Sequence, residues 1–170
     1  MSMSKTFPDM LLLRDPGQGS KPPHQPEQSP KRTRRQNEVA LASVPLFSGI
    51  SKRHLRRLAA EADVQDFQPG QTIVVEGMPG ETLFVVLEGQ AKVVRKKRKV
   101  GQVVPGDFFG ELSAIDGRER TASVVAETPM RLLRLFRHTL EDMVTSEPDF
   151  STKLLDGVVA RLRQVAGAGL

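Results

Sequence analysis

Two side chains of opposite charge, Glu111 and Arg120, stand nine residues apart in the segment GDFFGELSAIDGRERTASVV, residues 106–125. Arg120 offers a planar guanidinium that can donate to two phosphate oxygens at once. An ionised Glu111 is only an acceptor, so it requires a donor such as a ribose hydroxyl rather than another anion. Gly110 allows a short helix to begin at Glu111, with free backbone N–H groups that suit an anion. The segment therefore offers contacts for a phosphate and for a sugar hydroxyl.

Two hydroxyl groups beside the arginine, on Thr121 and Ser123, add further polar contacts. Taken alone, a carboxylate and an arginine at this spacing are more often a surface ion pair, worth at most about 1 kcal/mol. The whole string is more specific. It resembles the phosphate-binding cassette of the cyclic-nucleotide-binding domains, the family of bacterial catabolite activator proteins, protein kinase A regulatory subunits and cyclic-nucleotide-regulated channels. The resemblance extends from Val44 to about Val165.

The stretch before the cassette, GQTIVVEGMPGETLFVVLEG at residues 70–89, is similar to the same family. Its glycines permit the positive-φ turns that join short strands, so by themselves they would indicate only a tight β roll. The matching positions are Gly70, Ile73, Glu76, Gly77, Gly80, residues 83–87 and Gly89. Together with the cassette they identify the chain as a member of the family.

The resemblance implies a role for each residue of the site. Glu111 receives the ribose 2′-hydroxyl, Arg120 neutralises the cyclic phosphate, and Thr121 stands where some relatives contact the phosphate or a guanine amino group. The expected ligand is therefore cAMP, with cyclic GMP left open, and no separate cofactor is expected. The other expected ligand-binding residues of the cassette are Phe109, Gly110, Leu112, Ser113 and Ala122. The apolar walls around the base are expected at Val74, Val86, Leu87 and Val103, although strand residues of this kind are more often plain core.

The last helix departs from the family where the base is contacted. An ungapped match of ARLRQV, residues 160–165, places Ala166 and Gly167 where Thr and Ser of the bacterial activator reach adenine. Neither side chain can donate or accept a hydrogen bond. Base selectivity is therefore open. A degenerate pocket that binds no nucleotide stays an alternative, against which the intact Glu111 and Arg120 argue.

The elements that must position these residues follow from apolar spacing. Ser51 can cap a helix in which Leu55 and Leu58 face the same way. Brief β-branched runs then alternate with Gly, Pro and acidic turns, which favours a sandwich or barrel. The runs are VQDF, TIVV, TLFVVL, AKVV, VGQVV, ASVVA and MRLLRLF. Helical spacing returns around Leu140 and again from about Asp149. We therefore expect an α+β fold: a double-stranded β-helix (jelly-roll) β-barrel with flanking N-terminal and C-terminal helices.

The first 36 residues differ in composition from the rest. They hold seven Lys or Arg against three acidic residues, and so carry +4 of the formal charge of +5. From Asp15 to Gln36 they are rich in Pro, Gln, Ser and basic residues, and cannot bury enough apolar surface to offset the entropy of ordering. We expect a disordered Pro-rich basic tail over residues 1–36 and a cyclic-nucleotide-binding domain over residues 37–170.

Composition excludes several kinds of chemistry. The chain has no Cys, which rules out disulfide scaffolds, thiolate nucleophiles and Cys-ligated zinc, and its three His residues lack metal-ligand spacing. The cassette holds no evident nucleophile or base, so we expect no enzyme and no metal site. No apolar stretch approaches the about 20 residues that span a bilayer, or the core of a signal peptide. A cytoplasmic location is therefore expected.

The expected output is ligand-dependent movement of the C-terminal helices, which signals to an unknown effector protein. The bacterial activators continue into a DNA-reading helix-turn-helix, whereas this sequence stops at Leu170, so no recognition helix is expected. A DNA- or RNA-associated regulator that uses the basic tail and the RKKRK run at residues 95–99 is the alternative. The lack of Tyr and Trp for stacking on bases argues against nucleic acid as the partner.

The last helix also offers a short apolar seam, so a homodimer is left open. Its seam residues recur three and four apart, as in a two-heptad coiled coil. They are Leu155, Val158, Leu162 and Val165. Two heptads are few, and Gly157 weakens the helix by about 1 kcal/mol relative to Ala, so we expect the helix to act chiefly as a lid over the pocket.

Overall fold

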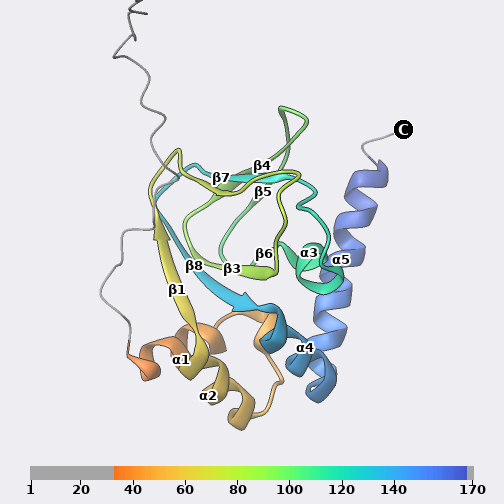
Figure 1. Ribbon diagram of the computed structural model, residues 1–170. Helices are drawn as coiled ribbons and strands as arrows, with labels where there is room; N and C mark the ends of the chain where they lie inside the picture. The colour runs from red at the N-terminus through yellow and green to blue at the C-terminus, as the bar shows by residue number, and fades with distance from the viewer. Residues whose placement is uncertain (1–32, 168–170) are drawn as a thin grey trace, which may run out of the picture.

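The computed structural model describes residues 33–167 of the chain (Figure 1). Helices precede and follow a block of strands, which confirms the predicted α+β jelly-roll with flanking helices. The helices are α1 (Arg34–Ala42), the 3-10 helix η1 (Pro45–Phe47), α2 (Lys52–Glu61), α3 (Glu111–Asp116), α4 (Arg137–Ser146) and α5 (Pro148–Gly167). The strands are β1 (Asp63–Phe67), β2 (Thr72–Val74), β3 (Thr82–Glu88), β4 (Ala91–Arg95), β5 (Arg98–Val103), β6 (Phe108–Phe109), β7 (Ser123–Ala126) and β8 (Met130–Phe136).

The strands form two four-stranded antiparallel sheets rather than one continuous closed barrel. One sheet has the order β1-β8-β3-β6 and the other the order β2-β7-β4-β5. Each of the seven predicted β-branched runs overlaps one strand. The additional strand, β6, has only two residues and pairs with Phe84 and Val85 of β3, so it is too short to show an alternating pattern.

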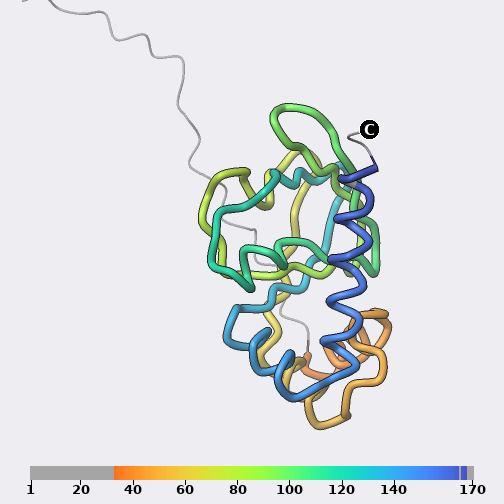
Figure 2. The backbone as a smooth tube through the Cα atoms, turned by 90° about the vertical axis from the view of Figure 1, so that its right-hand side faces the viewer, coloured from red at the N-terminus to blue at the C-terminus, as the bar shows by residue number. Residues whose placement is uncertain are grey.

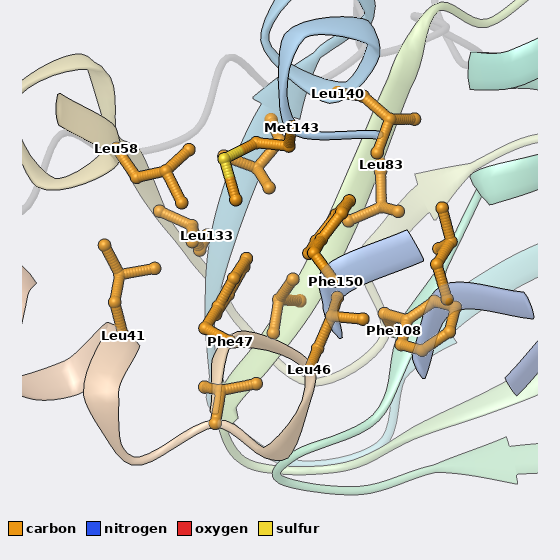
Figure 3. Close-up of a cluster of buried hydrophobic side chains, with 14 of the residues drawn as sticks. Leu41, Leu46, Phe47, Leu58, Leu83, Phe108, Leu133, Leu140, Met143 and Phe150 are labelled. Carbon is orange, nitrogen blue, oxygen red and sulfur yellow. The ribbon is translucent and has the colours of Figure 1, made fainter. Parts of the chain in front are cut away.

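Strand β3 divides the apolar interior in two, because successive side chains of a strand point to opposite faces. Leu83 (Figure 3) and Val85 face the helices, whereas Phe84 and Val86 face the space between the sheets. The helical cluster consists of Leu41, Val44, Leu46, Phe47, Leu58, Ala59, Leu83, Val85, Phe108, Ala114, Leu133, Leu135, Leu140, Met143, Phe150 and Leu154. The inner cluster consists of Val74, Phe84, Val86, Ala91, Val103, Phe109, Val124, Ala126, Met130 and Leu132. The helices are therefore held to one face of a sheet whose other face lines the roll.

Helix α1 begins at Arg34, inside the segment that was predicted to be disordered. Thr33 caps it with a capping box: the Thr33 hydroxyl accepts from the backbone N–H of Gln36, and the Gln36 side chain accepts from the backbone N–H of Thr33. Leu41, near the end of α1, is buried in the helical cluster. Ordered structure thus begins before the predicted boundary at residue 37. Residues 1–32 lie outside the described residues, and disorder there stays a prediction.

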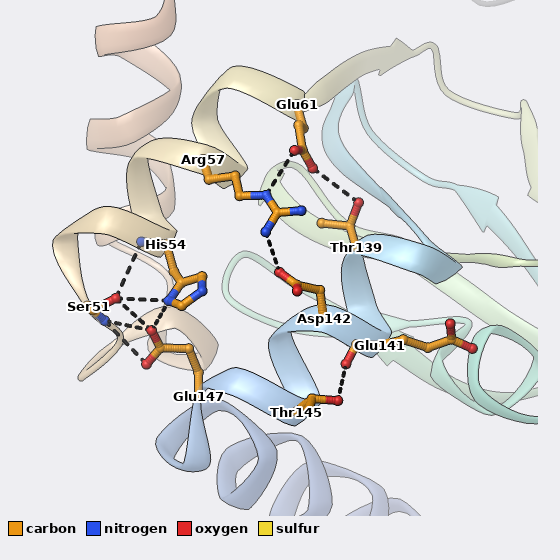
Figure 4. Close-up of polar contacts among 9 residues, drawn as sticks. All are labelled: Ser51, His54, Arg57, Glu61, Thr139, Glu141, Asp142, Thr145 and Glu147. Atoms are coloured by element: carbon orange, nitrogen blue, oxygen red, sulfur yellow. Dashed lines mark hydrogen bonds and ion pairs between the residues drawn. The ribbon is translucent and has the colours of Figure 1, made fainter.

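Polar contacts tie α2 to the junction between α4 and α5 (Figure 4). Glu147, at this junction, accepts hydrogen bonds from the backbone N–H and the hydroxyl of Ser51 at 3.3 and 2.6 Å, and contacts Nδ1 of His54. The hydrogen bond from the Ser51 side chain is the chief cause that lowers the pKa of Glu147. Arg57 of α2 pairs with Asp142 of α4 at 2.8 Å. The start of α5 is therefore anchored to α2.

From this junction α5 runs along the roll and past α3 (Figures 1 and 2). Gly157 allows a close approach to β6, because a Cβ there would lie 2.3 Å from the ring of Phe108. Of the predicted seam residues, Leu155 and Leu162 are 62% and 60% exposed, and Val158 is half-buried. The homodimer stays a prediction. Within residues 33–167, no helix is both long and apolar enough to cross a membrane.

Candidate functional site

The turn from β6 into α3 brings the two charged cassette residues together. Gly110 has a φ of 81°, in the left-handed region that glycine adopts without strain. A Cβ at this position would lie 2.4 Å from Nη1 of Arg120 and 2.8 Å from the carbonyl oxygen of Thr82. Glycine is therefore required both by the backbone conformation and by the packing. Glu111 follows as the first residue of α3, close enough to Arg120 for their charges to interact.

Arg120 is a buried cation, 7% exposed, whose head group is held by hydrogen bonds. Its Nη1 donates to the carbonyl oxygens of Thr82 and Gly110 at 2.9 and 3.0 Å, and to Oγ of Ser113 at 2.7 Å. Its Nη2 donates to Oγ1 of Thr82 at 2.9 Å. Burial lowers the pKa of Arg120, and the nearby carboxylate of Glu111 opposes this change. The guanidinium stays charged at neutral pH, so the site holds a fixed positive charge out of water.

Glu111 is buried as well, with 3% of its surface exposed. Its Oε1 accepts a hydrogen bond from Nη1 of Arg161, on α5, at 2.6 Å. Its Oε2 is buried and has no hydrogen-bond partner among residues 33–167. A buried acceptor without a donor costs about 1–3 kcal/mol, and more when it is charged. The carboxylate is therefore positioned to accept a hydrogen bond from a bound molecule.

Arg161 is a site residue that the sequence reasoning missed. Its guanidinium carbon lies 4.9 Å from the ring centroid of Phe108, while one of its nitrogens pairs with Glu111. The sequence shows only that Arg161 belongs to the last helix. Its contact with the cassette depends on where α5 packs against β6. In the sequence, this packing is indicated only weakly, by Gly157, which allows a close approach.

The other predicted cassette residues divide into a buried and an exposed group. Ser113 is buried and accepts a hydrogen bond from Arg120 at 2.7 Å. Leu112 and Thr121 are exposed and line a cavity of about 540 Å³, together with the loop that follows α3. Ala122 is half-buried. The structure therefore brings Ser113 to the two charged groups, whereas Leu112 and Thr121 line this separate cavity.

Three of the four predicted wall residues belong to the inner cluster: Val74, Val86 and Val103. Phe109 joins them, and its ring stacks on that of Phe84 with centroids 5.2 Å apart. The fourth, Leu87, packs against the helical cluster on the opposite face of β3. The expectation treated Val86 and Leu87 as parts of one surface, whereas neighbouring strand residues point to opposite sides. The structure does not bring Leu87 to the other wall residues.

Comparison with known families matches residues 64–147 to the family described as "Cyclic nucleotide-binding domain". The chain is 30% identical, over 129 residues, to a CRP-like cAMP-activated global transcriptional regulator of Mycobacterium tuberculosis. This match covers 73% of the chain but only 58% of the regulator, so the chain spans little more than half the length of that relative.

Two solved structures are similar in fold. One is the N-terminal domain of a transcriptional regulator from Streptomyces coelicolor, with 32% identity and a TM-score of 0.57 over 77% of this chain and 95% of that one. The other is the regulatory domain of Toxoplasma gondii PKA in a co-crystal structure with cAMP. It has 26% identity and a TM-score of 0.64 over 72% of this chain and 49% of that one.

Proposed function

The chain belongs to the cyclic-nucleotide-binding domain family, and from that premise we propose that it binds cAMP at Glu111 and Arg120 and reports the binding through its C-terminal helices. The names of its relatives, one cAMP-activated and one crystallised with cAMP, support this choice of ligand. Both relatives are regulators, which supports a regulatory module without catalysis of its own.

The observation that carries the proposal is the pair of buried, opposite charges that lie close together, one of which has a carboxylate oxygen without a hydrogen-bond partner among residues 33–167. Arg120 requires an anion, whereas Oε2 of Glu111 requires a donor. A ribose 3′,5′-cyclic phosphate supplies both within one rigid ring system, since its 2′-hydroxyl lies next to the carbon that bears the phosphate. Its phosphodiester carries a single negative charge, which matches the single guanidinium.

An open-chain mononucleotide fits the same site less well. A phosphate monoester carries about −1.5 to −2 charges at pH 7. Only one guanidinium is buried in the cassette, and the carboxylate of Glu111 is close to it. The second charge would therefore lie near a carboxylate without a partner of its own. The site should thus discriminate between a cyclic phosphate and a monoester.

The proposed signal passes through Glu111, because this residue is shared between the ligand and α5. Its Oε1 already holds Arg161 of α5 at 2.6 Å. A ribose hydroxyl that donates to the same carboxylate reduces the negative charge available to Arg161 and changes the free energy with which α5 docks. A ligand can shift this equilibrium only through such differential contacts. The exposed Leu155 and Leu162 on α5 are the surface that we propose an effector protein reads.

Titration calorimetry of the wild-type protein with cAMP, cyclic GMP and AMP tests the proposal. We expect saturable binding of cAMP at one site per chain. AMP should bind at least about tenfold more weakly, since leaving one charge without a partner costs more than the about 1.4 kcal/mol that a factor of ten represents. The cyclic GMP titration measures base selectivity, for which the side chains of Ala166 and Gly167 provide no hydrogen bond. If neither cyclic AMP nor cyclic GMP binds, the proposed function is contradicted and a degenerate pocket is favoured.

A further inference from the structure

One edge of the Arg120 guanidinium is hydrogen-bonded to a single residue outside the cassette. Thr82, the first residue of β3, accepts from both terminal nitrogens: its carbonyl oxygen takes Nη1 at 2.9 Å and its Oγ1 takes Nη2 at 2.9 Å. This two-point contact resembles the way a carboxylate binds the end of an arginine, and it fixes the rotation of the planar group. Thr82 is itself fixed, because it pairs with Phe136 of β8.

The remaining hydrogen bonds of Arg120 fall on the same end of the guanidinium. Nη1 also donates to the carbonyl oxygen of Gly110 at 3.0 Å and to Oγ of Ser113 at 2.7 Å, so its two hydrogens serve three acceptors. A guanidinium carries five N–H groups. Within residues 33–167, Nε makes no hydrogen bond, and Nη2 makes only the one to Thr82. The Nε hydrogen and the second Nη2 hydrogen are therefore available, and they point in parallel along the side edge of the group.

Residue 80 packs closely against the guanidinium and has to be glycine. A Cβ on Gly80 would lie 2.1 Å from Nε, 2.3 Å from Cζ and 2.6 Å from Nη2 of Arg120. Any other side chain would push the guanidinium out of the position that Thr82 defines. Thr82 thus occupies the Nη1/Nη2 edge, and Gly80 gives the guanidinium the room to stay in that position.

We infer that Thr82 is a positioning residue for the phosphate site: it holds the Nη1/Nη2 edge of Arg120 so that the Nε/Nη2 edge donates to two oxygens of the cyclic phosphate. This inference rests on the proposed function. Because an unheld guanidinium can rotate about its long side chain, the hydroxyl of Thr82 contributes to affinity without touching the ligand. Arg120 is the residue that binds, and Thr82 determines the edge that it presents.

The test measures cAMP affinity in variants that change the hydroxyl alone. Thr82→Val is close to isosteric and removes Oγ1, and we expect the dissociation constant to rise about tenfold, as for the loss of one hydrogen bond to a charged group. Thr82→Ser keeps the hydroxyl and should stay within about twofold of wild type. Thr72→Val, on the exposed part of β2, is the matched control and should have no effect. Thr82→Ala also removes Oγ1 and should show a similar loss of cAMP affinity, which separates the loss of the hydroxyl from any effect of valine on the strand.

A double-mutant cycle with Arg120→Lys separates positioning from a general structural effect. Lysine is a point charge without two parallel donors, so the orientation that Thr82 imposes should cease to matter. We expect Thr82→Val to weaken binding by less than about twofold in the Arg120→Lys background, against about tenfold in wild type. Equal losses in both backgrounds, or no loss in wild type, would overturn the inference. Failure of the wild-type protein to bind any cyclic nucleotide would instead contradict the proposed function, and the inference with it.

Discussion

Replacing Arg161 with methionine should release α5 from the cassette in the ligand-free protein. The substitution keeps an apolar side chain over Phe108 but removes the cation that pairs with Glu111 at 2.6 Å. The side chain of Glu111 is 4% exposed and that of Arg161 is 33% exposed, so the pair is intermediate between a buried and a surface ion pair. We therefore estimate a loss of about 2 kcal/mol in the docking free energy of α5, at the low end for a broken buried pair. This corresponds to about a thirtyfold rise in the undocked population.

Amide hydrogen exchange measures this population directly. We expect the backbone amides of residues 158–167 to exchange up to about thirtyfold faster in Arg161→Met than in wild type, with the amides of β3 unchanged. Arg163→Met is the matched control, because Arg163 lies two residues along the same helix and is exposed. Equal exchange in the two variants would refute the idea that the pair with Glu111 holds α5.

Three further outcomes are expected. Gly80→Ala should leave the fold intact, since the atoms that it meets belong to the end of the Arg120 side chain, but weaken cAMP binding at least about tenfold by calorimetry; unchanged affinity would contradict the packing argument. Glu147 has its pKa lowered chiefly by Ser51, so it stabilises the fold above the ordinary value of about 4.3, and this contribution is lost as the pH falls through the lower folded value. Glu147→Gln should therefore lower the Tm at about pH 6 but cost progressively less below about pH 4.3, and a pH-independent difference would oppose this. If α5 forms the seam of a homodimer, Leu162→Asp should shift sedimentation to the monomer, whereas a tight dimer that survives this change would exclude the seam.

The roll could be predicted from the sequence because its signals are local. Glycines that permit turns recur between brief β-branched runs, and each run proved to overlap a strand. Strand β6 shows the limit of this reasoning, since two phenylalanines define no alternation and only the pairing with β3 makes them a strand. The start of helix α1 has a local signal too, since Thr33 and Gln36 form the Thr-x-x-Gln pattern of a capping box within an otherwise polar, basic stretch.

The cassette was predictable for the same reason, but its surroundings were not. Glu111 and Arg120 lie in one short segment, and the structure places both in the interior, close together. Arg161 and Thr82 lie 50 and 38 residues from the groups that they contact. Such contacts depend on how α5 and β3 pack, which no local pattern specifies. The position of Leu87 on the opposite face of β3 from Val86 follows a simpler rule, because neighbouring strand residues alternate between the two faces.

The most direct test of the account is the affinity of Arg120→Leu for cAMP, compared with Arg118→Leu. Arg118 lies two residues away with 85% of its side chain exposed, so its loss removes the same formal charge from the same loop without touching the buried site. Truncating one member of a buried, hydrogen-bonded charge pair costs about 2–5 kcal/mol, so the dissociation constant of Arg120→Leu should rise about thirtyfold to several thousandfold. Arg118→Leu should bind as wild type, and circular dichroism should show both variants folded. A folded Arg120→Leu protein that binds cAMP within about threefold of wild type would contradict the assignment of the phosphate to this arginine.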